Sequence, residues 1–322
     1  MPRGGLAVIG VVGAVAAVIG LWAGPAGGGA DRKGLSIYWI DVEGGECELL
    51  ATVTNRKDKT GASAAAVDAI NTYYGRPNIP IGTDKQGPTA LQRTSAFAAA
   101  LRDGFPNDIG PDDHAPDALE IYRRVLAAQP DGNVTICSVG ALSNLAELWR
   151  REPELVRTKV RRLVVMGGEF PNSKKPETNI RTHREAAQVV AAEWPGEIIW
   201  HGFEVGNVLI TGARLKQTPR NNPVRRAYEL RQYQGRPSIA GGQPSYDQAA
   251  ALFAVRGVEP EFWETIAGGR VRVDAEGLTT WQPDAAAKHA YVKIAGDPQR
   301  LAAIIEALMV ASPKSPTTGE SK

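Results

Sequence analysis

The chain has few of the residues that build metal clusters and covalent cross-links. Only two cysteines, Cys47 and Cys137, and four histidines occur in 322 residues. Two cysteines do not make a disulfide framework, and no two histidines share the spacing of zinc ligands. The sequence therefore predicts neither a disulfide-rich fold nor a zinc enzyme. Cys137 lies in an apolar run, so we expect a buried thiol there.

Charge and hydropathy exclude two further classes of protein. The formal net charge is only +2 and no dense face of lysine and arginine stands out, so nothing favours a nucleic-acid-binding protein. Beyond the first 30 residues, no apolar run is long enough to span a bilayer. With 43% hydrophobic and 22% charged residues, the composition is that of an ordinary globular protein.

The first 30 residues have the order of a targeting segment. Arg3 precedes the apolar run Leu6–Ala23, and the small-residue stretch GPAGGGA follows before the charged Asp31. This order predicts a secretory signal peptide over residues 1–30, with cleavage near Ala30. The run is also just long enough to cross a bilayer, so an uncleaved N-terminal membrane anchor is the alternative. In either case we expect an exported protein, periplasmic or extracellular.

Apolar runs alternate with helical patterns in the rest of the chain. The strand-like runs are Leu35–Ile40, Leu49–Thr54, Ile79–Ile81, Val134–Ser138, Val160–Met166, Ile198–His201, Arg270–Val273 and Tyr291–Ile294. Helical spacing marks Ala62–Tyr74, Pro116–Ala128, Leu142–Arg150, Arg184–Trp194, Gln248–Arg256 and Leu301–Val310. The alternation predicts an α/β fold, with a mainly parallel open sheet and helices on both faces. We expect one domain over residues 35–311 and a disordered tail at 312–322.

Two of the expected strands end in glycine turns followed by polar residues. Val134–Ser138 runs into Val139-Gly140-Ala141, and Val160–Met166 runs into Gly167-Gly168 and then a polar loop. That loop presents Asn172, Glu177 and Asn179. Open α/β sheets bind ligands at the carboxyl ends of their strands. A carboxylate and two carboxamides there suit a polyhydroxylated ligand such as a sugar, and a solvated loop is the alternative.

Five segments in order resemble the inosine/uridine-preferring nucleoside hydrolases. They are SVGALSNLAEL, VVMGGEF, ETNI, the stretch from LLATVT to GRPNIPIG, and PSYDQ at residues 244–248. The resemblance covers roughly residues 47–310 and implies a nucleoside hydrolase-like fold. It also implies hydrolysis of the N-glycosidic bond of ribonucleosides, with a small-molecule riboside as the partner and one calcium ion as the cofactor.

The resemblance also assigns roles to individual residues. It implies calcium ligands at Asp247 and at the backbone carbonyl of Val139. The residues that it places on the ribose are Asn55 (or Asp58), Met166, Asn172, Glu177 and Asn179. In such enzymes the ion holds the ribose diol and a water, and an aspartate accepts the proton of that water.

The chain departs from this family at the start of the fold. The family opens with an aspartate cluster, DxDxxxDD, where this chain reads DVEGGECE after Leu35–Ile40. At matched spacing, Asp41, Glu43 and Glu48 would be metal ligands and Glu43 the general base, while Cys47 replaces a carboxylate. The helix that should follow is absent, and eight residues are too few for a parallel crossover. Either Leu35–Ile40 does not pair as the first strand of the family does, or it lies at another place or in another direction in the sheet.

The alternatives for function follow from these departures. The family's leaving-group histidine corresponds here to Tyr246, which could donate a proton, stack on a base or simply pack. The first hypothesis is an exported, calcium-dependent ribonucleoside hydrolase. The second is a catalytically impaired relative that binds a sugar or nucleoside without turnover, and the third is a recombined reading frame that folds poorly. Relatives are often oligomers, so a homo-oligomer is also possible.

Overall fold

The structure is a computed structural model that describes residues 6–12, 47–55, 59–85 and 94–313. The expected strand Leu35–Ile40, together with Asp41, Glu43 and Asp58, lies outside these ranges, as does most of the predicted tail. In the part of the chain that is described, no helix has the length and apolar character needed to cross a membrane.

Nine strands of the described residues form a single sheet. They are β1 (Leu6–Val12), β2 (Cys47–Thr54), β3 (Ile81–Thr83), β4 (Val134–Ser138), β5 (Val160–Met166), β6 (Glu197–His201), β11 (Trp263–Val273), β12 (Thr279–Pro283) and β13 (His289–Ile294). Their spatial order is β12-β11-β13-β6-β5-β4-β1-β2-β3. All neighbours from β13 to β3 are parallel, and β11 and β12 add an antiparallel edge. The predicted α/β class with a mainly parallel sheet is confirmed.

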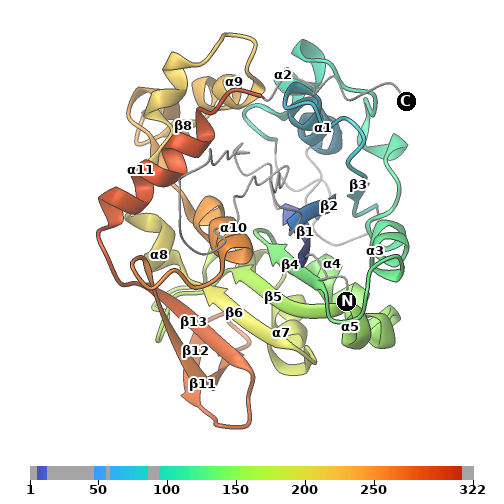
Figure 1. Ribbon diagram of the computed structural model, residues 1–322, viewed down its shortest axis with the longest axis vertical. Helices are drawn as coiled ribbons and strands as arrows, with labels where there is room; N and C mark the ends of the chain where they lie inside the picture. Colours follow the sequence, from blue (N-terminus) through green and yellow to red (C-terminus); the bar gives the residue numbers. More distant parts are fainter. Residues whose placement is uncertain (1–5, 13–46, 56–58, 86–93, 314–322) are drawn as a thin grey trace, which may run out of the picture.

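Helices cover both faces of this sheet (Figure 1). One face carries α3 (Ala118–Ala127), α4 (Ser143–Arg151), α5 (Pro153–Lys159) and α7 (Arg184–Glu193). The other carries α1 (Ser63–Tyr73), α2 (Ala98–Gly104), α8 (Phe203–Asn207), α9 (Pro223–Leu230), α10 (Tyr246–Arg256) and α11 (Pro298–Met309). Along β5, Leu163 and Val165 belong to the first core, and Val164 and Met166 to the second. Buried parallel strands read as continuous apolar runs because both of their faces are covered in this way.

Shorter elements complete the chain. They are α6 (Thr178–Thr182), the 3-10 turns η1 (Asp112–His114), η2 (Ala213–Gln217) and η3 (Ser238–Ala240), the pair β7 (Ile210–Thr211) with β10 (Gln243–Pro244), and the hairpin β8 (Gln232–Tyr233) with β9 (Arg236–Pro237). The hairpin turns at Gln234-Gly235, where both residues have positive φ. A two-residue turn of this kind matches the twist of the strands it joins.

The main surprise in the sheet is β1. Leu6–Val12 lies inside the segment that the sequence predicts as a leader, yet it forms the strand between β2 and β4. Val11, for example, is paired with Val53 on one side and with Ser138 on the other. A leader core and a doubly covered parallel strand have the same apolar sequence, so the pattern alone cannot separate them. The signal peptide stays a prediction, and the structure gives part of that segment a place in the fold.

The position of β1 predicts a large effect of backbone changes there. We expect Val11→Pro to remove the cooperative thermal unfolding transition, because proline cannot donate to the ladder in a central strand. Val11→Ile keeps the backbone donor and the strand preference, and should melt as the unchanged chain does. Calorimetry together with the intact mass of the folded protein measures this. A folded product that begins near residue 31 would show that the sheet does not need β1.

Candidate functional site

The turns after β2 and β4 are joined at the carboxyl edge of the sheet. Asn55 follows β2 directly, is fully buried, and donates from Nδ2 to the carbonyl oxygen of Ala141. Asn144, at the start of α4, donates from Nδ2 to the carbonyl oxygen of Thr54 at 3.3 Å. These contacts hold the Val139–Ala141 turn against the end of β2. The predicted ribose residue Asn55 and the predicted carbonyl ligand Val139 therefore lie at the same edge.

Glu177 is the N-cap of α6 and faces the turn after β5. Its Oε2 accepts from the backbone N–H groups of Asn179 at 2.8 Å, Ile180 at 3.3 Å and Gly168 at 3.4 Å. No described residue donates to Oε1, which leaves that oxygen for a ligand. Burial raises the pKa of Glu177, although the backbone N–H groups counteract part of the rise. Capping thus orients the carboxylate while one oxygen stays open.

Asn179 is locked to the end of β5. Its Nδ2 donates to the carbonyl oxygen of Met166 at 3.0 Å and lies 3.2 Å from the Met166 sulfur. Both residues are almost fully buried. With Nδ2 engaged, the amide oxygen of Asn179 is the group left to meet a ligand.

Asp247 enters from the first turn of α10, which packs across β4, β5 and β6. The residue is partly buried, and this burial raises the pKa of its carboxyl group to about 7, with a further rise from the negative charge of Glu177 and a decrease from Arg231. Asp247 in turn adds to the pKa rise that burial causes at the Cys137 thiol of β4. Met166, Glu177, Asn179 and Asp247 therefore converge, and we call these four residues the carboxyl-edge site.

An aromatic pair lies beside this site. The ring of Tyr246 stacks on Phe203 with 5.2 Å between centroids, and its hydroxyl donates to Asn207 Oδ1 at 3.1 Å. Burial raises the pKa of Tyr246 to about 12, and nearby Tyr233, Glu177 and Asp247 contribute to the rise. The hydroxyl therefore keeps its proton at neutral pH. The stacked pair offers an aromatic surface next to the carboxylates.

Two predicted site residues are not brought to the carboxyl-edge site. Glu48 lies at the amino end of β2 and pairs with Ala7, about 20 Å along the strand from Thr54 at roughly 3.3 Å per residue. The backbone of β2 thus places Glu48 at the edge of the sheet opposite to the carboxyl-edge site, and its role as a metal ligand stays a prediction. Asn172 is exposed and bridged to Thr280 of β12, and no contact among the described residues joins it to Glu177 or Asp247.

The described residues do not form a complete calcium site. Calcium takes six to eight oxygen ligands, several of them anionic. The structure offers the carboxylates of Glu177 and Asp247 and the carbonyl of Val139, and within the described ranges no group of three or more His, Cys, Asp or Glu residues could hold a metal ion. The remaining predicted ligands, Asp41 and Glu43, lie outside those ranges.

Glu204 and Thr279 hold the turn after β5, and sequence analysis missed both. Gly168 has a φ of +78°, and a Cβ there would lie 2.9 Å from Thr279 Oγ1, so only glycine fits. Thr279 Oγ1 accepts from the N–H of Glu169 at 3.1 Å, and Glu204 Oε2 accepts from the N–H of Phe170 at 3.2 Å. An acidic residue three positions after the strand Ile198–His201 was the available signal for Glu204.

His201, at the end of β6, is a structural residue. It is fully buried and its ring packs edge-on against Phe253 at 4.8 Å and Trp263 at 5.5 Å. Burial lowers its pKa to about 3, so the ring stays neutral. This agrees with its apolar surroundings and gives it no part in the carboxyl-edge site.

Comparison of the sequence with known protein families identifies the family. Residues 35–302 match the profile of the family described as inosine-uridine preferring nucleoside hydrolase. The chain belongs to this family. The family predicted from the five sequence segments is therefore confirmed. Hydrolases of this family are generally metal-dependent.

Solved structures and one further sequence are similar to the chain. A plant nucleoside hydrolase superposes with a TM-score of 0.63 at 21% identity, covering 85% of this chain and 93% of that one. The inosine-uridine preferring nucleoside hydrolase of Bacillus anthracis gives 0.62 at 17%, covering 82% and 90%. The type III effector XopQ, solved with adenosine diphosphate ribose, gives 0.60 at 15%, covering 96% of each chain. An uncharacterized protein of Schizosaccharomyces pombe is 25% identical over 222 residues, 63% of this chain and 67% of its own.

The buried carboxyl of Glu204 predicts a pH-dependent stability. Burial raises its pKa to about 7 from an ordinary 4.5, against the effect of backbone N–H groups. The folded state thus holds a proton that the unfolded state loses near pH 4.5, so this stabilisation is complete at low pH and is lost as the pH rises through 7. We expect Glu204→Gln to melt with the unchanged chain at pH 4 and a few °C above it at pH 8.

Thermal melts across this pH range measure the effect. Glu276→Gln, which changes an exposed carboxylate, is the control and should shift neither end of the curve. A Glu204→Gln curve parallel to that of the unchanged chain would show that Glu204 is ionised in the fold.

Proposed function

We propose that the chain binds a ribonucleoside-type riboside at the carboxyl-edge site. The observation that carries this proposal is the convergence of Glu177 and Asp247, two partly buried carboxylates, with the buried Asn179 at the ends of β4 and β5. Carboxylate and amide oxygens accept hydrogen bonds from hydroxyl groups, and bonds to a charged acceptor are the stronger ones. The open Oε1 of Glu177 and the carboxylate of Asp247 suit the 2′ and 3′ hydroxyls of a ribose.

The aromatic pair gives the base a place. Tyr246 is the residue next to Asp247, and its ring already stacks on Phe203 at 5.2 Å. A flat, partly exposed aromatic pair beside two sugar-binding carboxylates suits a nucleobase joined to that sugar. Because the Tyr246 hydroxyl donates to Asn207, we assign this tyrosine to packing against the base rather than to proton donation. The XopQ structure, which contains adenosine diphosphate ribose, supports a ribose-containing ligand for this fold.

Hydrolysis of the N-glycosidic bond is the second candidate, and family membership favours it. It requires a base for the attacking water and, in the predicted form, calcium. Asp41 and Glu43 would have to complete the donor set from outside the described residues. Riboside binding requires neither, which is why it comes first. Export of the protein remains a proposal that rests on the composition of residues 1–30.

Substitutions at the carboxyl-edge site should weaken nucleoside binding. We expect Asp247→Asn to lower the affinity for inosine about tenfold to a hundredfold, because a charge-assisted hydrogen bond is worth roughly 1.5–3 kcal/mol. Asn179→Ala should cost about tenfold. Isothermal titration measures both. Asp131→Asn, which removes an exposed aspartate paired with Lys159, is the control and should leave the affinity unchanged. Equal affinity for all these proteins would place nucleoside binding elsewhere.

Calcium separates binding from hydrolysis. We expect inosine and uridine to bind both in calcium and in a chelator, because Glu177 and Asn179 can hold hydroxyls directly, and we expect no release of base in either buffer. Base release is followed by chromatography. Calcium-dependent release that Asp247→Ala and Glu43→Gln both abolish would establish the hydrolase instead. Inosine binding that disappears in the chelator would contradict direct binding by the protein.

A further inference from the structure

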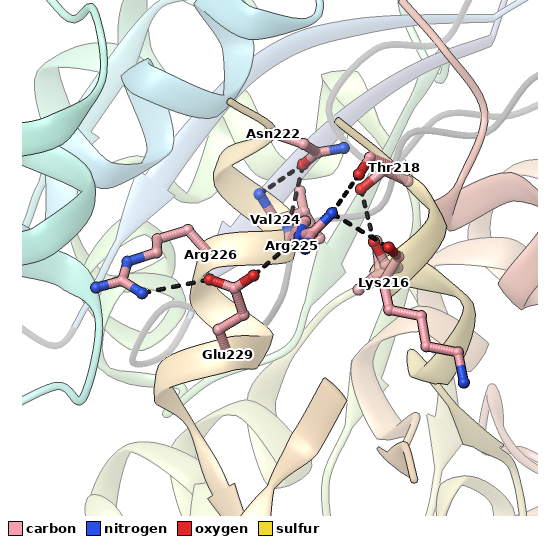
Figure 2. A network of polar contacts seen from close by, with 8 residues as sticks. Lys216, Thr218, Asn222, Val224, Arg225, Arg226 and Glu229 are labelled. Carbon is pink, nitrogen blue, oxygen red and sulfur yellow. Dashed lines mark hydrogen bonds and ion pairs between the residues drawn. The ribbon is translucent and has the colours of Figure 1, made fainter. Parts of the chain in front are cut away.

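Helix α9 is anchored firmly at its start (Figure 2). Asn222 caps it, with Oδ1 accepting from the N–H groups of Val224 at 2.8 Å and Arg225 at 3.2 Å. Arg225 bonds Glu229 through Nε at 2.9 Å, and its Nη1 donates to the carbonyl oxygens of Lys216 and Thr218. These contacts fix the helix to the preceding loop, so the position of the residue that follows the helix is fixed as well.

That residue is Arg231, and its guanidinium is held in one orientation. Its backbone N–H donates to Ala227 at 2.9 Å, and its carbonyl accepts from Ser238 at 2.8 Å. Its Nε donates to Gln243 Oε1 at 2.9 Å, and the buried Ser238 hydroxyl donates to the same oxygen at 2.9 Å. Ordering a long side chain costs entropy, so an arginine that the fold has already oriented binds a partner at lower cost.

Within the described part of the chain, the outer nitrogens of this guanidinium have no partner. Arg231 is exposed, and among the described residues nothing accepts from Nη1 or Nη2 and no carboxylate lies within 4.0 Å. Arginine carries five N–H donors in a planar fork that matches phosphate and carboxylate groups. Nε is used, so the four Nη donors remain for a ligand.

Arg231 is also close to the carboxyl-edge site. Gln243, which holds it, lies in β10 only four residues before Asp247. The positive charge of Arg231 lowers the pKa of Asp247, although burial raises it by more, so the two charges interact. The adjoining hairpin brings Tyr233 near Tyr246 in the same way. The bond to Gln243 thus ties Arg231 to the segment that leads into α10 and Asp247.

We propose that Arg231 is an anion subsite beside the carboxyl-edge site, and that the preferred ligand is a riboside carrying a 5′-phosphate. The inference rests on the proposed function. In that arrangement the base is attached to C1′ of the ribose, and the carboxylates bind the hydroxyls of C2′ and C3′. C5′ is then the position whose substituent has no assigned contact. A phosphate there gives the free Nη donors a partner, and charge-assisted bonds of this kind are among the strongest in proteins.

The alternative role for Arg231 is to balance the charge of Asp247. A balancing charge would affect the binding of a nucleoside and of its 5′-monophosphate alike. A phosphate subsite affects only the ratio of the two affinities. That ratio is therefore the quantity to measure.

The test uses isothermal titration of the full chain with inosine and with inosine 5′-monophosphate, in a chelator so that no metal bridges the phosphate. We expect the monophosphate to bind at least about tenfold more tightly, and Arg231→Gln to bring the ratio close to one. Arg231→Lys keeps the charge without the fork and should retain part of the preference. Arg226→Gln removes a charge from the same helix, where Arg226 pairs with Glu229 at 3.3 Å, and should leave the ratio unchanged.

Each other result overturns the inference. Equal affinities in the unchanged chain, or a preference that survives Arg231→Gln, rule out the subsite. Inorganic phosphate serves as a further probe, and monophosphate binding that phosphate displaces but Asn179→Ala does not weaken would be binding of an adventitious ion only. If neither inosine nor its monophosphate binds, the proposed riboside binding is itself wrong, and the anion subsite is excluded with it. A thermal melt of each variant confirms that it is folded.

Discussion

The arrangement of the carboxyl edge depends on one strand lying between β2 and β4. These two strands do not pair with each other, and β1 supplies the hydrogen-bonding groups that both require. Without it the parallel sheet would divide into two parts, each with an unpaired edge. The bond from Asn55 to Ala141 joins the turns that follow β2 and β4, so the relative placement of these turns depends on the same strand.

The identity of that central strand also determines which charges reach the site. The residues after β1, from 13 to 30, include no aspartate or glutamate. The carboxylates of the site therefore come from other elements, Glu177 from the cap of α6 and Asp247 from the first turn of α10. Two acids that meet in a buried place repel each other, which is part of the reason that the pKa of Asp247 rises to about 7. A diol that donates hydrogen bonds, a cation or an arginine would each reduce this repulsion between the two carboxylates.

Local patterns predicted single strands better than they predicted the order of the strands in the sheet. Val134–Ser138 and Val160–Met166 are strands with the predicted bounds, because a short apolar run between turn residues has few other structures available. Met166, Glu177 and Asn179, which the resemblance places on the ribose, lie together at the end of β5, and their role in binding stays a prediction. Local patterns could not predict that Leu6–Val12 forms a strand of the sheet, because a buried parallel strand and the apolar part of a signal peptide have the same composition. Motif spacing says nothing about which end of a strand a residue occupies, so it could not show that Glu48 lies at the amino end of β2.

Long-range pairing accounts for what the sequence could not show. Glu204 supports the turn after β5 only because Phe170, 34 residues away, donates to it, and Arg231 is oriented by Gln243 beyond an intervening hairpin. The result is a site with two carboxylates on one side and an oriented arginine near them. Such a separation of charge favours a ligand that is rich in hydroxyls at one end and negative at the other. A neutral sugar would satisfy only the carboxylates of this arrangement, and a simple anion would satisfy only the arginine.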